Sequence, residues 1–326
     1  MSIKISVIVP LYNVQDYVFR TIQSLEKQTI KDYIEVILVN DGSKDNTLRV
    51  VQNLMKNSKI NYHIISKVNE GVSKTRNVGI VNARGKYLYF VDGDDYIHET
   101  MLEKMYKKAE DEKAEVTFCG YTHIEEGTGK EVMKVHKYID KTMDGLTVAG
   151  KMLKNEIWIG PMAGFYLADF VKTNKITFEE DIYFGEDTVF AIKSLMNAKR
   201  VACVKEPLGY YFRRGTSITK SGGEKYFNLH ESNLVMLNYN RKYFKDIQVE
   251  KSLLQYKIPQ SIIRIFVSLG RSGVCKEELF NFVKNEDIKK YLKGFKINGY
   301  KENIKFKIAS KVLLISPKLM YKLLSK

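Results

Sequence analysis

The sequence predicts an α/β protein with a doubly wound, mostly parallel sheet, followed by a helical region. Over roughly the first hundred residues, β-branched runs alternate with segments of helical apolar spacing, an order typical of parallel sheets. Near residue 220 the strand patterns stop and the apolar spacing becomes helical throughout. We therefore expect an α/β domain over residues 1–220 and a helical, basic region over residues 221–326.

The predicted strands of the first domain are apolar runs that end in proline, glycine or acidic residues. Strands are expected at residues 3–10, 33–40, 62–66, 87–91, 115–121 and 200–205. Helices are expected at residues 16–28, 48–55, 72–83, 101–112 and 143–153. Polar residues 122–142 predict a hairpin with an exposed loop, and residues 158–164, which contain the single tryptophan, predict a loop.

The second region shows helical spacing with several interruptions. Helices are predicted at residues 226–245, 251–269 and 277–293, and Ile258-Pro259 predicts a kink or break in the second of them. The formal net charge of +15 belongs to residues 201–326, because acidic and basic residues nearly balance over residues 1–200.

Composition narrows the class of protein. The three cysteines are far apart and form no Cys-x-x-Cys pair, so we expect neither a zinc site nor a disulfide framework, and a reduced cytoplasmic setting fits. The start of the chain shows no signal-peptide pattern, and no apolar run approaches the roughly 20 residues that span a bilayer. Nucleic acid is not an expected partner. A dinucleotide fingerprint and a P-loop are both missing from the sequence.

Polar residues follow the ends of three predicted strands. They are Tyr12, Asp41 and the segment Asp92-Gly93-Asp94. Because the carboxyl ends of parallel strands share one edge, we expect these residues to converge. Two carboxylates separated by a glycine suit Mn²⁺ or Mg²⁺, and an aromatic ring beside a carboxylate can hold a base. For the Asp-Gly-Asp segment alone, an ordinary surface turn is the alternative.

Four segments together resemble the family-2 glycosyltransferases of the GT-A fold. They are Val7-Ile8-Val9-Pro10-Leu11-Tyr12-Asn13, Val39-Asn40-Asp41-Gly42-Ser43, Asn69-Glu70-Gly71-Val72-Ser73 with Arg76, and Phe90-Val91-Asp92-Gly93-Asp94-Asp95. All four occur in the family's order. The resemblance implies a GT-A catalytic domain, an inverting transferase, a nucleotide-sugar donor and a divalent metal.

The resemblance also implies roles for single residues. Pro10, Tyr12 and Asp41 would line the nucleoside, with Asp41 on the base, and Arg76 would reach the nucleotide. Asp92 and Asp94 would serve the diphosphate and the metal. The competing interpretations are that Pro10 only ends a strand and that Arg76 is a solvated charge on a helix. Asp45 and Asp95 are expected to be turn or capping residues.

A second acidic segment, Gly185-Glu186-Asp187, resembles the family's base motif. Inverting transfer needs a group that takes the acceptor hydroxyl proton, and the matching aspartate is Asp187. Glu186 would orient or contact the acceptor. The alternative is that both acids only favour the start of a helix. Further along, Arg213 and Ser217 match the end of the catalytic domain in polysaccharide-building members, where they would close over the diphosphate.

These features predict an inverting glycosyltransferase that uses a UDP-sugar, by family habit, and a glycan or lipid-linked acceptor in cell-surface polysaccharide synthesis. One alternative is an inactive nucleotide-binding partner docked at the membrane. Another is a nucleotidyltransferase, which usually carries a basic, glycine-rich loop near its N-terminus that this sequence does not have.

The tail at residues 301–326 combines apolar and basic stripes. Ser316-Pro317 fits an N-cap and a first-turn proline, which predicts two short helices. The apolar stripe comprises Ile308, Val312, Ile315, Leu319 and Leu323, and the basic stripe comprises Lys307, Lys311, Lys318 and Lys322. This pattern predicts attachment to an anionic membrane surface, at the inner face of the cell membrane. The alternative is that the stripe packs on the protein's own helices.

Overall fold

The computed structural model describes residues 3–213, 223–297 and 301–324, with residues 301–303 described by their backbone alone. The described residues form two compact units. Unit 1 comprises residues 3–148, 157–181 and 186–213, and unit 2 comprises 149–156, 182–185, 223–297 and 301–324. The predicted domain boundary at residue 220 falls outside the described residues and stays a prediction.

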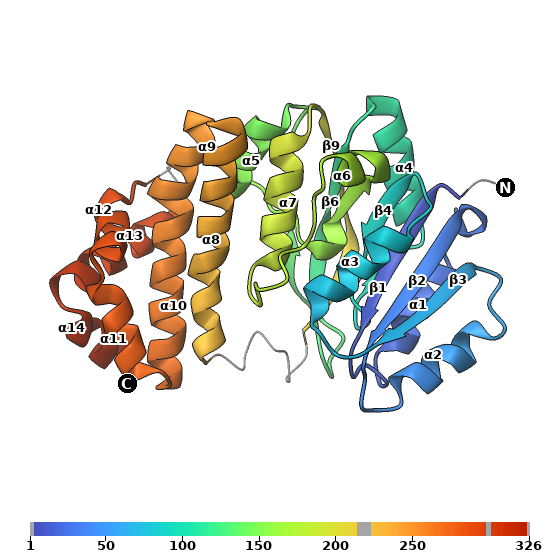
Figure 1. The fold of residues 1–326 in the computed structure, drawn as a ribbon, viewed down its shortest axis with the longest axis horizontal. Helices are drawn as coiled ribbons and strands as arrows, with labels where there is room; N and C mark the ends of the chain where they lie inside the picture. The colour runs from blue at the N-terminus through green and yellow to red at the C-terminus, as the bar shows by residue number, and fades with distance from the viewer. Residues whose placement is uncertain (1–2, 214–222, 298–300, 325–326) are drawn as a thin grey trace. The chain divides into compact units, whose positions relative to one another are not determined.

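Unit 1 is built on one mixed sheet, and the nine strands described in it follow the spatial order β3-β2-β1-β4-β8-β6-β9-β5, with β7 beside β6 (Figure 1). The strands are β1 (Ile5–Leu11), β2 (Ile34–Asp41), β3 (Asn61–Lys67), β4 (Tyr87–Phe90), β5 (Tyr96–Ile97), β6 (Val116–Glu125), β7 (Glu131–Val135), β8 (Gly164–Leu167) and β9 (Val201–Arg213). The pairs β1–β2, β1–β4, β2–β3 and β6–β9 are parallel. The predicted mostly parallel, doubly wound core is confirmed.

Helices cover both faces of this sheet. Those of unit 1 are α1 (Val18–Glu26), α2 (Thr47–Met55), α3 (Val72–Asn82), α4 (Met101–Glu112), α6 (Ala168–Thr173) and α7 (Glu186–Asn197), with short 3₁₀ turns η1 (Lys31–Tyr33) and η2 (Pro161–Ala163). Alternate side chains of β1 pack with those of α1, α2 and α4 in one core. On the opposite face, α3 comes so close that Gly79 has no room for a Cβ beside Ile8. This close approach fixes α3 against the parallel strands.

A buried carboxylate ties the start of β4 to β1 and β2. Glu35 has no exposed surface and accepts hydrogen bonds from Ser6 Oγ at 2.6 Å and from the Arg84 backbone N–H at 2.7 Å. The Arg84 guanidinium also donates to Glu35, at 2.8 and 3.0 Å. Burial alone would raise the pKa of Glu35, but these bonds outweigh it and lower the pKa. The contact therefore sets the position of β4, whose far end carries Asp92.

Several predicted elements of unit 1 differ from those observed. Residues 158–164 were expected to be a loop, yet Gly164 begins β8, a strand between β4 and β6. The last strand was expected to end at Lys205 but continues to Arg213, because β6 also continues and pairs with it in parallel as far as Glu125. The predicted hairpin after residue 121 is confirmed by the β6–β7 pair.

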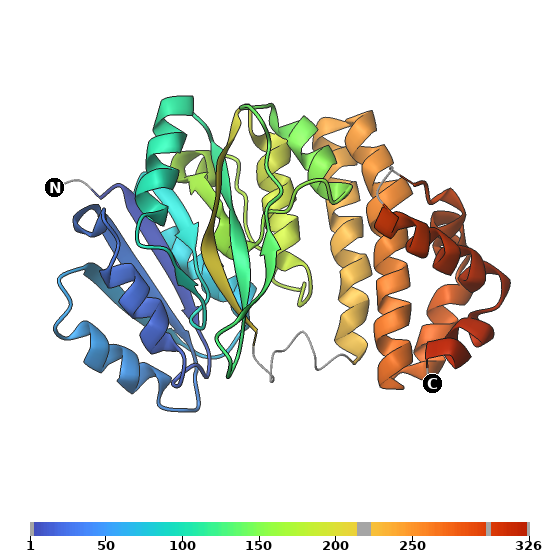
Figure 2. The ribbon, with the colours of Figure 1, turned by 180° about the vertical axis from the view of Figure 1, so that it is seen from behind.

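Unit 2 is helical, and α10 packs against five of its other helices, α8, α11, α12, α13 and α14 (Figure 2). Its elements are η4 (Glu224–Phe227), α8 (Asn228–Tyr239), α9 (Ile247–Ser252), α10 (Ile258–Ser272), α11 (Lys276–Lys284), α12 (Glu286–Gly294), α13 (Lys301–Ile315) and α14 (Pro317–Leu324), with π-helical turns η5 (Asn240–Phe244) and η6 (Leu253–Lys257). The residues of α5 (Gly145–Leu153) fall in both units.

The predicted break at Ile258-Pro259 is confirmed, because α10 begins there after a π-helical turn. The single helix predicted over residues 277–293 is wrong. Asn285 ends α11 and caps α12 by accepting hydrogen bonds from the backbone N–H groups of Asp287 and Ile288.

The prediction of two helices in the tail is confirmed, and Ser316 Oγ accepts from the Leu319 N–H at the start of α14. Helix α13 buries Ser310 and Leu313 instead of the predicted apolar stripe. Four stripe residues are at least half exposed: Ile308 (59%), Ile315 (84%), Leu319 (51%) and Leu323 (60%). In the described part of the chain, no helix has the length and apolar character that crossing a membrane requires.

Candidate functional site

The ends of β1, β2 and β4 lie at one edge of the sheet, because these strands are adjacent and parallel. Pro10 is buried within β1, and Tyr12, just beyond it, is 40% exposed. The loops after β1 and β2 are tied together by hydrogen bonds from the Asn13 N–H to Ser43 Oγ at 3.2 Å and from the Lys44 N–H to Asn13 Oδ1 at 2.9 Å. The predicted convergence of these strand ends is confirmed.

The Asp92-Gly93-Asp94 segment forms a turn that packs on the end of β1. A Cβ on Gly93 would lie 2.9 Å from the Leu11 side chain and 3.2 Å from the Pro10 carbonyl oxygen, so the close approach favours glycine. Asp95 completes the turn, since its N–H donates to the Asp92 carbonyl at 3.0 Å.

Asp45 and Asp95 both accept hydrogen bonds from backbone N–H groups, in agreement with their predicted turn and capping roles. The Asp95 carboxylate is buried and accepts from the Phe212 N–H at 2.8 Å. Asp45 accepts from the Thr47 N–H at 2.9 Å, at the start of α2. Both acids therefore stabilise the loops of this edge.

Asp41 organises the loop that leads into α3. Its side chain is 4% exposed and accepts hydrogen bonds from the backbone N–H groups of Glu70 (3.0 Å) and Gly71 (2.9 Å). It also accepts from Asn69 Nδ2 at 3.3 Å and forms an ion pair with Lys67. These bonds fix the first turn of α3, and the contact with a base stays a prediction.

Arg76 joins two acidic segments that are far apart in the sequence. Its side chain is 2% exposed, and it donates from Nη2 to Asp92 Oδ1 at 2.8 Å and from Nη1 to Glu186 Oε1 at 3.1 Å. Its guanidinium carbon also lies 5.1 Å from the centre of the Phe178 ring. Burial alone would lower the pKa of Arg76, but the two carboxylates raise it. A solvated charge on a helix is therefore excluded.

Glu186 and Asp187 begin α7 beside this arginine. Burial and the negative charge of Asp187 raise the pKa of Glu186, against the opposing effect of Arg76. Asp187 is partly exposed and accepts from the Thr188 N–H at 2.7 Å. The pair thus places two partly exposed carboxyl groups at one helix start, next to the arginine that holds Asp92.

The last two predicted site residues are Arg213 and Ser217. Arg213 is exposed at the end of β9 and donates from Nε to His123 Nδ1 at 3.0 Å. Burial and the charge of Arg213 lower the pKa of His123 to about 4, so this histidine is neutral at physiological pH. Ser217 lies outside the described residues. The roles of Arg213 and Ser217 at a diphosphate stay predictions.

Sequence reasoning missed three residues near these groups. Lys67 ends β3 opposite Asp41 in the strand register, and the pairing of the two strand ends was the available signal. Burial raises the pKa of Tyr121 and of Tyr166, and the charge of Asp187 adds to it, so both phenols lie within its electrostatic reach. No local pattern marks either tyrosine, because they come from β6 and β8.

The chemistry of Asp92 and Asp94 fits a divalent cation that is shared with a ligand. The Asp92 side chain is 29% exposed although Arg76 contacts one of its oxygens, and Asp94 is also partly exposed. The described residues contain no group of three or more acidic, histidine or cysteine side chains that could enclose a metal alone. Two carboxylates completed by phosphate oxygens and water are a usual arrangement for such cations.

The family model described as "Glycosyl transferase family 2" matches residues 6–175. Among curated proteins, the Bacillus subtilis (strain 168) protein named "Uncharacterized glycosyltransferase EpsJ" is 29% identical over 285 residues. That match covers 84% of this chain and 73% of the relative.

Solved structures share the fold. S. aureus TarS 1–349 in complex with UDP-GlcNAc has a TM-score of 0.72 and 21% identity, covering 98% of this chain and 92% of that one. The mannosyltransferase PcManGT from Pyrobaculum calidifontis, in complex with GDP-Man and Mn²⁺, has a TM-score of 0.56 and 13% identity, covering 98% and 88%. Because the family model matches just over half of the sequence and spans both the Asp41 and the Asp92-Gly93-Asp94 segments, the chain belongs to glycosyl transferase family 2.

Proposed function

We propose that the chain is an inverting glycosyltransferase that moves a sugar from a UDP-sugar to a hydroxyl group of a glycan or lipid-linked acceptor in the synthesis of a cell-surface polysaccharide. The observation that carries the proposal is the position of Arg76, which contacts both Asp92 of the Asp-Gly-Asp turn and Glu186 beside Asp187. A donor-binding turn and a proton acceptor are the two parts that this reaction needs, and one arginine connects them.

The donor would bind at the shared strand edge. The exposed ring of Tyr12 offers a surface on which a base can stack, beside Pro10 and the ordered loop that Asp41 holds. TarS, which has the same fold, binds UDP and UDP-GlcNAc, and this supports a UDP-sugar as donor. Arg213, at the end of β9, would approach the diphosphate, and Ser217 would also contact it.

Asp92 and Asp94 would hold Mn²⁺ or Mg²⁺ together with the donor diphosphate. When bound, the cation supplies positive charge that stabilises the leaving diphosphate. The Mn²⁺ complex of PcManGT, a protein of related fold, supports this assignment. Arg76 fixes the Asp92 carboxylate from the buried side, so the partly exposed part of that side chain is oriented toward a ligand.

Asp187 would act as the base. The acceptor hydroxyl oxygen attacks the anomeric carbon while the bond from that carbon to the diphosphate oxygen breaks, and the hydroxyl proton passes to the Asp187 carboxylate. The nucleoside diphosphate leaves with the electron pair, and the anomeric configuration inverts. Glu186, whose pKa is raised, would orient the acceptor, with Arg76 holding its carboxyl group in place.

The tail would attach the enzyme peripherally to the inner face of the cell membrane. Four residues of the apolar stripe are at least half exposed, and Lys311, Lys318 and Lys322 are exposed on the same two helices. An apolar face bordered by lysines suits an anionic bilayer surface. This placement brings the enzyme to a lipid-linked acceptor.

The metal assignment is tested by Asp94→Asn. With a panel of UDP- and GDP-sugars and Mn²⁺, the wild type should release nucleoside diphosphate from at least one donor, whereas the variant should release almost none, because it lacks one anionic ligand. The thermal unfolding midpoint should stay unchanged, since the side chain is partly exposed. The matched control is Asp111→Asn on the exposed surface of α4. Near-normal turnover of Asp94→Asn at saturating Mn²⁺ would contradict the assignment.

The base is tested by Asp187→Asn, which should lower kcat by roughly 10²–10⁴, the usual effect of losing a general base. The amide oxygen can still accept from the Thr188 N–H, so the start of α7 should be preserved. Affinity for UDP, measured by calorimetry, should change little. An equal loss of UDP affinity would show that Asp187 is a ligand or a structural residue.

The coupling role of Arg76 is tested by Arg76→Lys. A lysine keeps the charge but cannot donate to both Asp92 and Glu186 in the same geometry. Losing one hydrogen bond to a charged group costs about 1.5–3 kcal/mol, so we expect kcat/KM to fall roughly 10- to 150-fold. The control is Arg84→Lys, because Arg84 also donates two bonds to one carboxylate, Glu35, at the opposite end of β4. If both variants lose activity equally, Arg76 only stabilises the fold.

The membrane attachment is tested by the double variant Ile308→Gln/Leu319→Gln in co-sedimentation with vesicles that contain anionic lipid. Full burial of each apolar side chain in the bilayer contributes about 1.5–3 kcal/mol to the free energy of vesicle binding. The vesicle affinity of the double variant should therefore fall at least roughly tenfold. Both residues are more than half exposed, and the fold should therefore survive. The matched control is Ile247→Gln, a 64% exposed residue of α9. Equal binding by all three proteins would refute attachment through the stripe.

A further inference from the structure

A cavity of about 970 Å³ lies within unit 2, between α10 and α13. Its lining residues are Tyr226, Ile263, Arg264, Val267, Ser268, Arg271, Ser272, Lys305, Phe306 and Ala309. Three of them are basic and none is acidic, and the other side chains are hydroxyl-bearing or apolar. The lining therefore suits a ligand that carries negative charge on one part and an apolar group on another.

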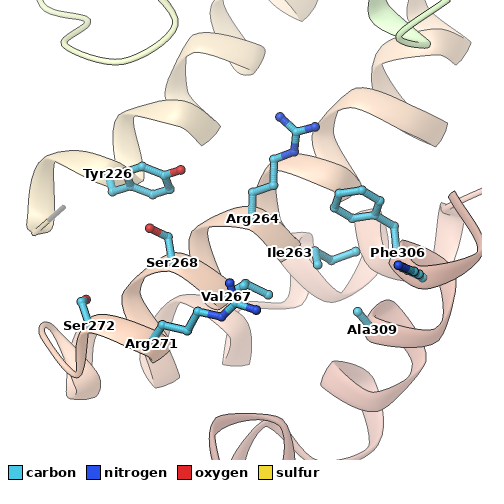
Figure 3. A pocket seen from close by; sticks show the side chains of 10 residues that line it. Tyr226, Ile263, Arg264, Val267, Ser268, Arg271, Ser272, Phe306 and Ala309 are labelled. Carbon is cyan, nitrogen blue, oxygen red and sulfur yellow. The ribbon is translucent and has the colours of Figure 1, made fainter. Parts of the chain in front are cut away.

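The basic residues come from two helices that face the same space. Arg264, Ser268 and Arg271 recur at steps of four and three along α10, so they share one side of that helix (Figure 3). Lys305 and Phe306 come from α13, and the Arg264 guanidinium carbon lies 5.6 Å from the centre of the Phe306 ring. Among the residues that the structure describes, Arg271 and Lys305 have no acidic partner.

We propose that this cavity binds the terminal phosphate monoester of an anionic membrane lipid. The phosphate would lie among Arg264, Arg271 and Lys305, where the Ser268 hydroxyl can also donate a hydrogen bond. The first carbons of the lipid would contact Val267 and Phe306. The proposal rests on the membrane attachment described above and adds a defined headgroup site to it.

The position of the cavity on α13 favours a lipid over a free phosphate. The same helix that supplies Lys305, Phe306 and Ala309 to the lining exposes half or more of Ile304 (50%) and Ile308 (59%). A small anion would contact the basic residues but would leave the apolar side chains of the lining without an apolar partner. A phosphate esterified to an apolar chain matches both parts, and α13 would then contact the bilayer beside the bound headgroup.

The test compares binding to charge-matched vesicles in which phosphatidylcholine is mixed with either phosphatidic acid or phosphatidylserine. Phosphatidic acid ends in a phosphate monoester, whereas the phosphate of phosphatidylserine is a diester capped by serine at similar surface charge. The cavity variant is Arg264→Gln/Arg271→Gln, and the control Lys318→Gln/Lys322→Gln removes the same charge from α14, outside the cavity. All four residues are exposed, so both variants should fold, and thermal unfolding verifies this.

We expect the wild type and the α14 control to prefer phosphatidic acid, and the cavity variant to lose that preference, so that its two partition coefficients become equal. Loss of binding to both lipids in the same proportion would overturn the proposal, because only general surface charge would then matter. Competition by inorganic phosphate or glycerol phosphate as strong as that by phosphatidic acid would also overturn it, in favour of a site for free phosphate.

The same experiment separates this proposal from the others. Absence of wild-type binding to any anionic vesicle would overturn both the attachment and the headgroup site. The lipid assay contains no nucleotide sugar, so its outcome does not depend on transferase activity. Failure to release UDP in the separate donor assay would contradict the transferase function, while a cavity-dependent lipid preference would still support the headgroup site.

Discussion

The buried guanidinium of Arg76 is the constraint on which the proposed active site depends. A charge that is 2% exposed is tolerated only when it is paired, and here two carboxylates from different segments provide the pairing. The arginine therefore fixes the turn after β4 and the start of α7 to the second turn of α3. Its Nε is buried without a hydrogen-bond partner among the described residues, so Asp92 and Glu186 provide the direct carboxylate contacts, and the nearby charge of Asp187 adds to their effect. Removing either acid would leave a buried cation only half paired.

The position of Arg76 in turn depends on Asp41. The backbone N–H groups of Glu70 and Gly71 point at that carboxylate, and Gly71 has a φ of +96°, in the region that favours glycine. The start of α3 is thereby fixed before the helix reaches Arg76. A nucleoside bound next to Asp41 would contact a carboxylate that is already ordered by the protein. Electrostatic preorganisation of this kind costs no rearrangement when the donor binds.

The sequence predicted the features of this site that depend on local pattern. Buried strands, glycine turns and acids at strand ends all follow from a few neighbouring residues, and so did the convergence of β1, β2 and β4. The Arg76–Glu186 contact could not be predicted in this way, because it joins residues 110 positions apart. The four-residue strand β8 was missed for a related reason, since it is too short for a periodic pattern and exists because β4 and β6 pair with it on either side. The Asn285 cap, in contrast, is a local signal. It was missed because the helical apolar spacing continues on both sides of it.

Net charge is distributed unevenly between residues 1–200 and residues 201–326, and the two parts therefore suit different kinds of anionic ligand. A nucleotide sugar is anionic, yet residues 1–200 are nearly balanced in charge, so the proposed donor site would rely on a few placed groups and the proposed cation rather than on a broad positive field. The surplus of +15 lies in residues 201–326, where it includes the lysines of α13 and α14 and the arginines of α10. Exposed charges act over about a Debye length, roughly 8 Å at physiological ionic strength, so they attract an extended anionic surface and are weakened by salt. The buried ion pairs of Arg76 are screened much less. The proposed membrane attachment and the proposed base chemistry at Asp187 should therefore respond differently to ionic strength, because the first would depend on exposed cations and the second on a buried one.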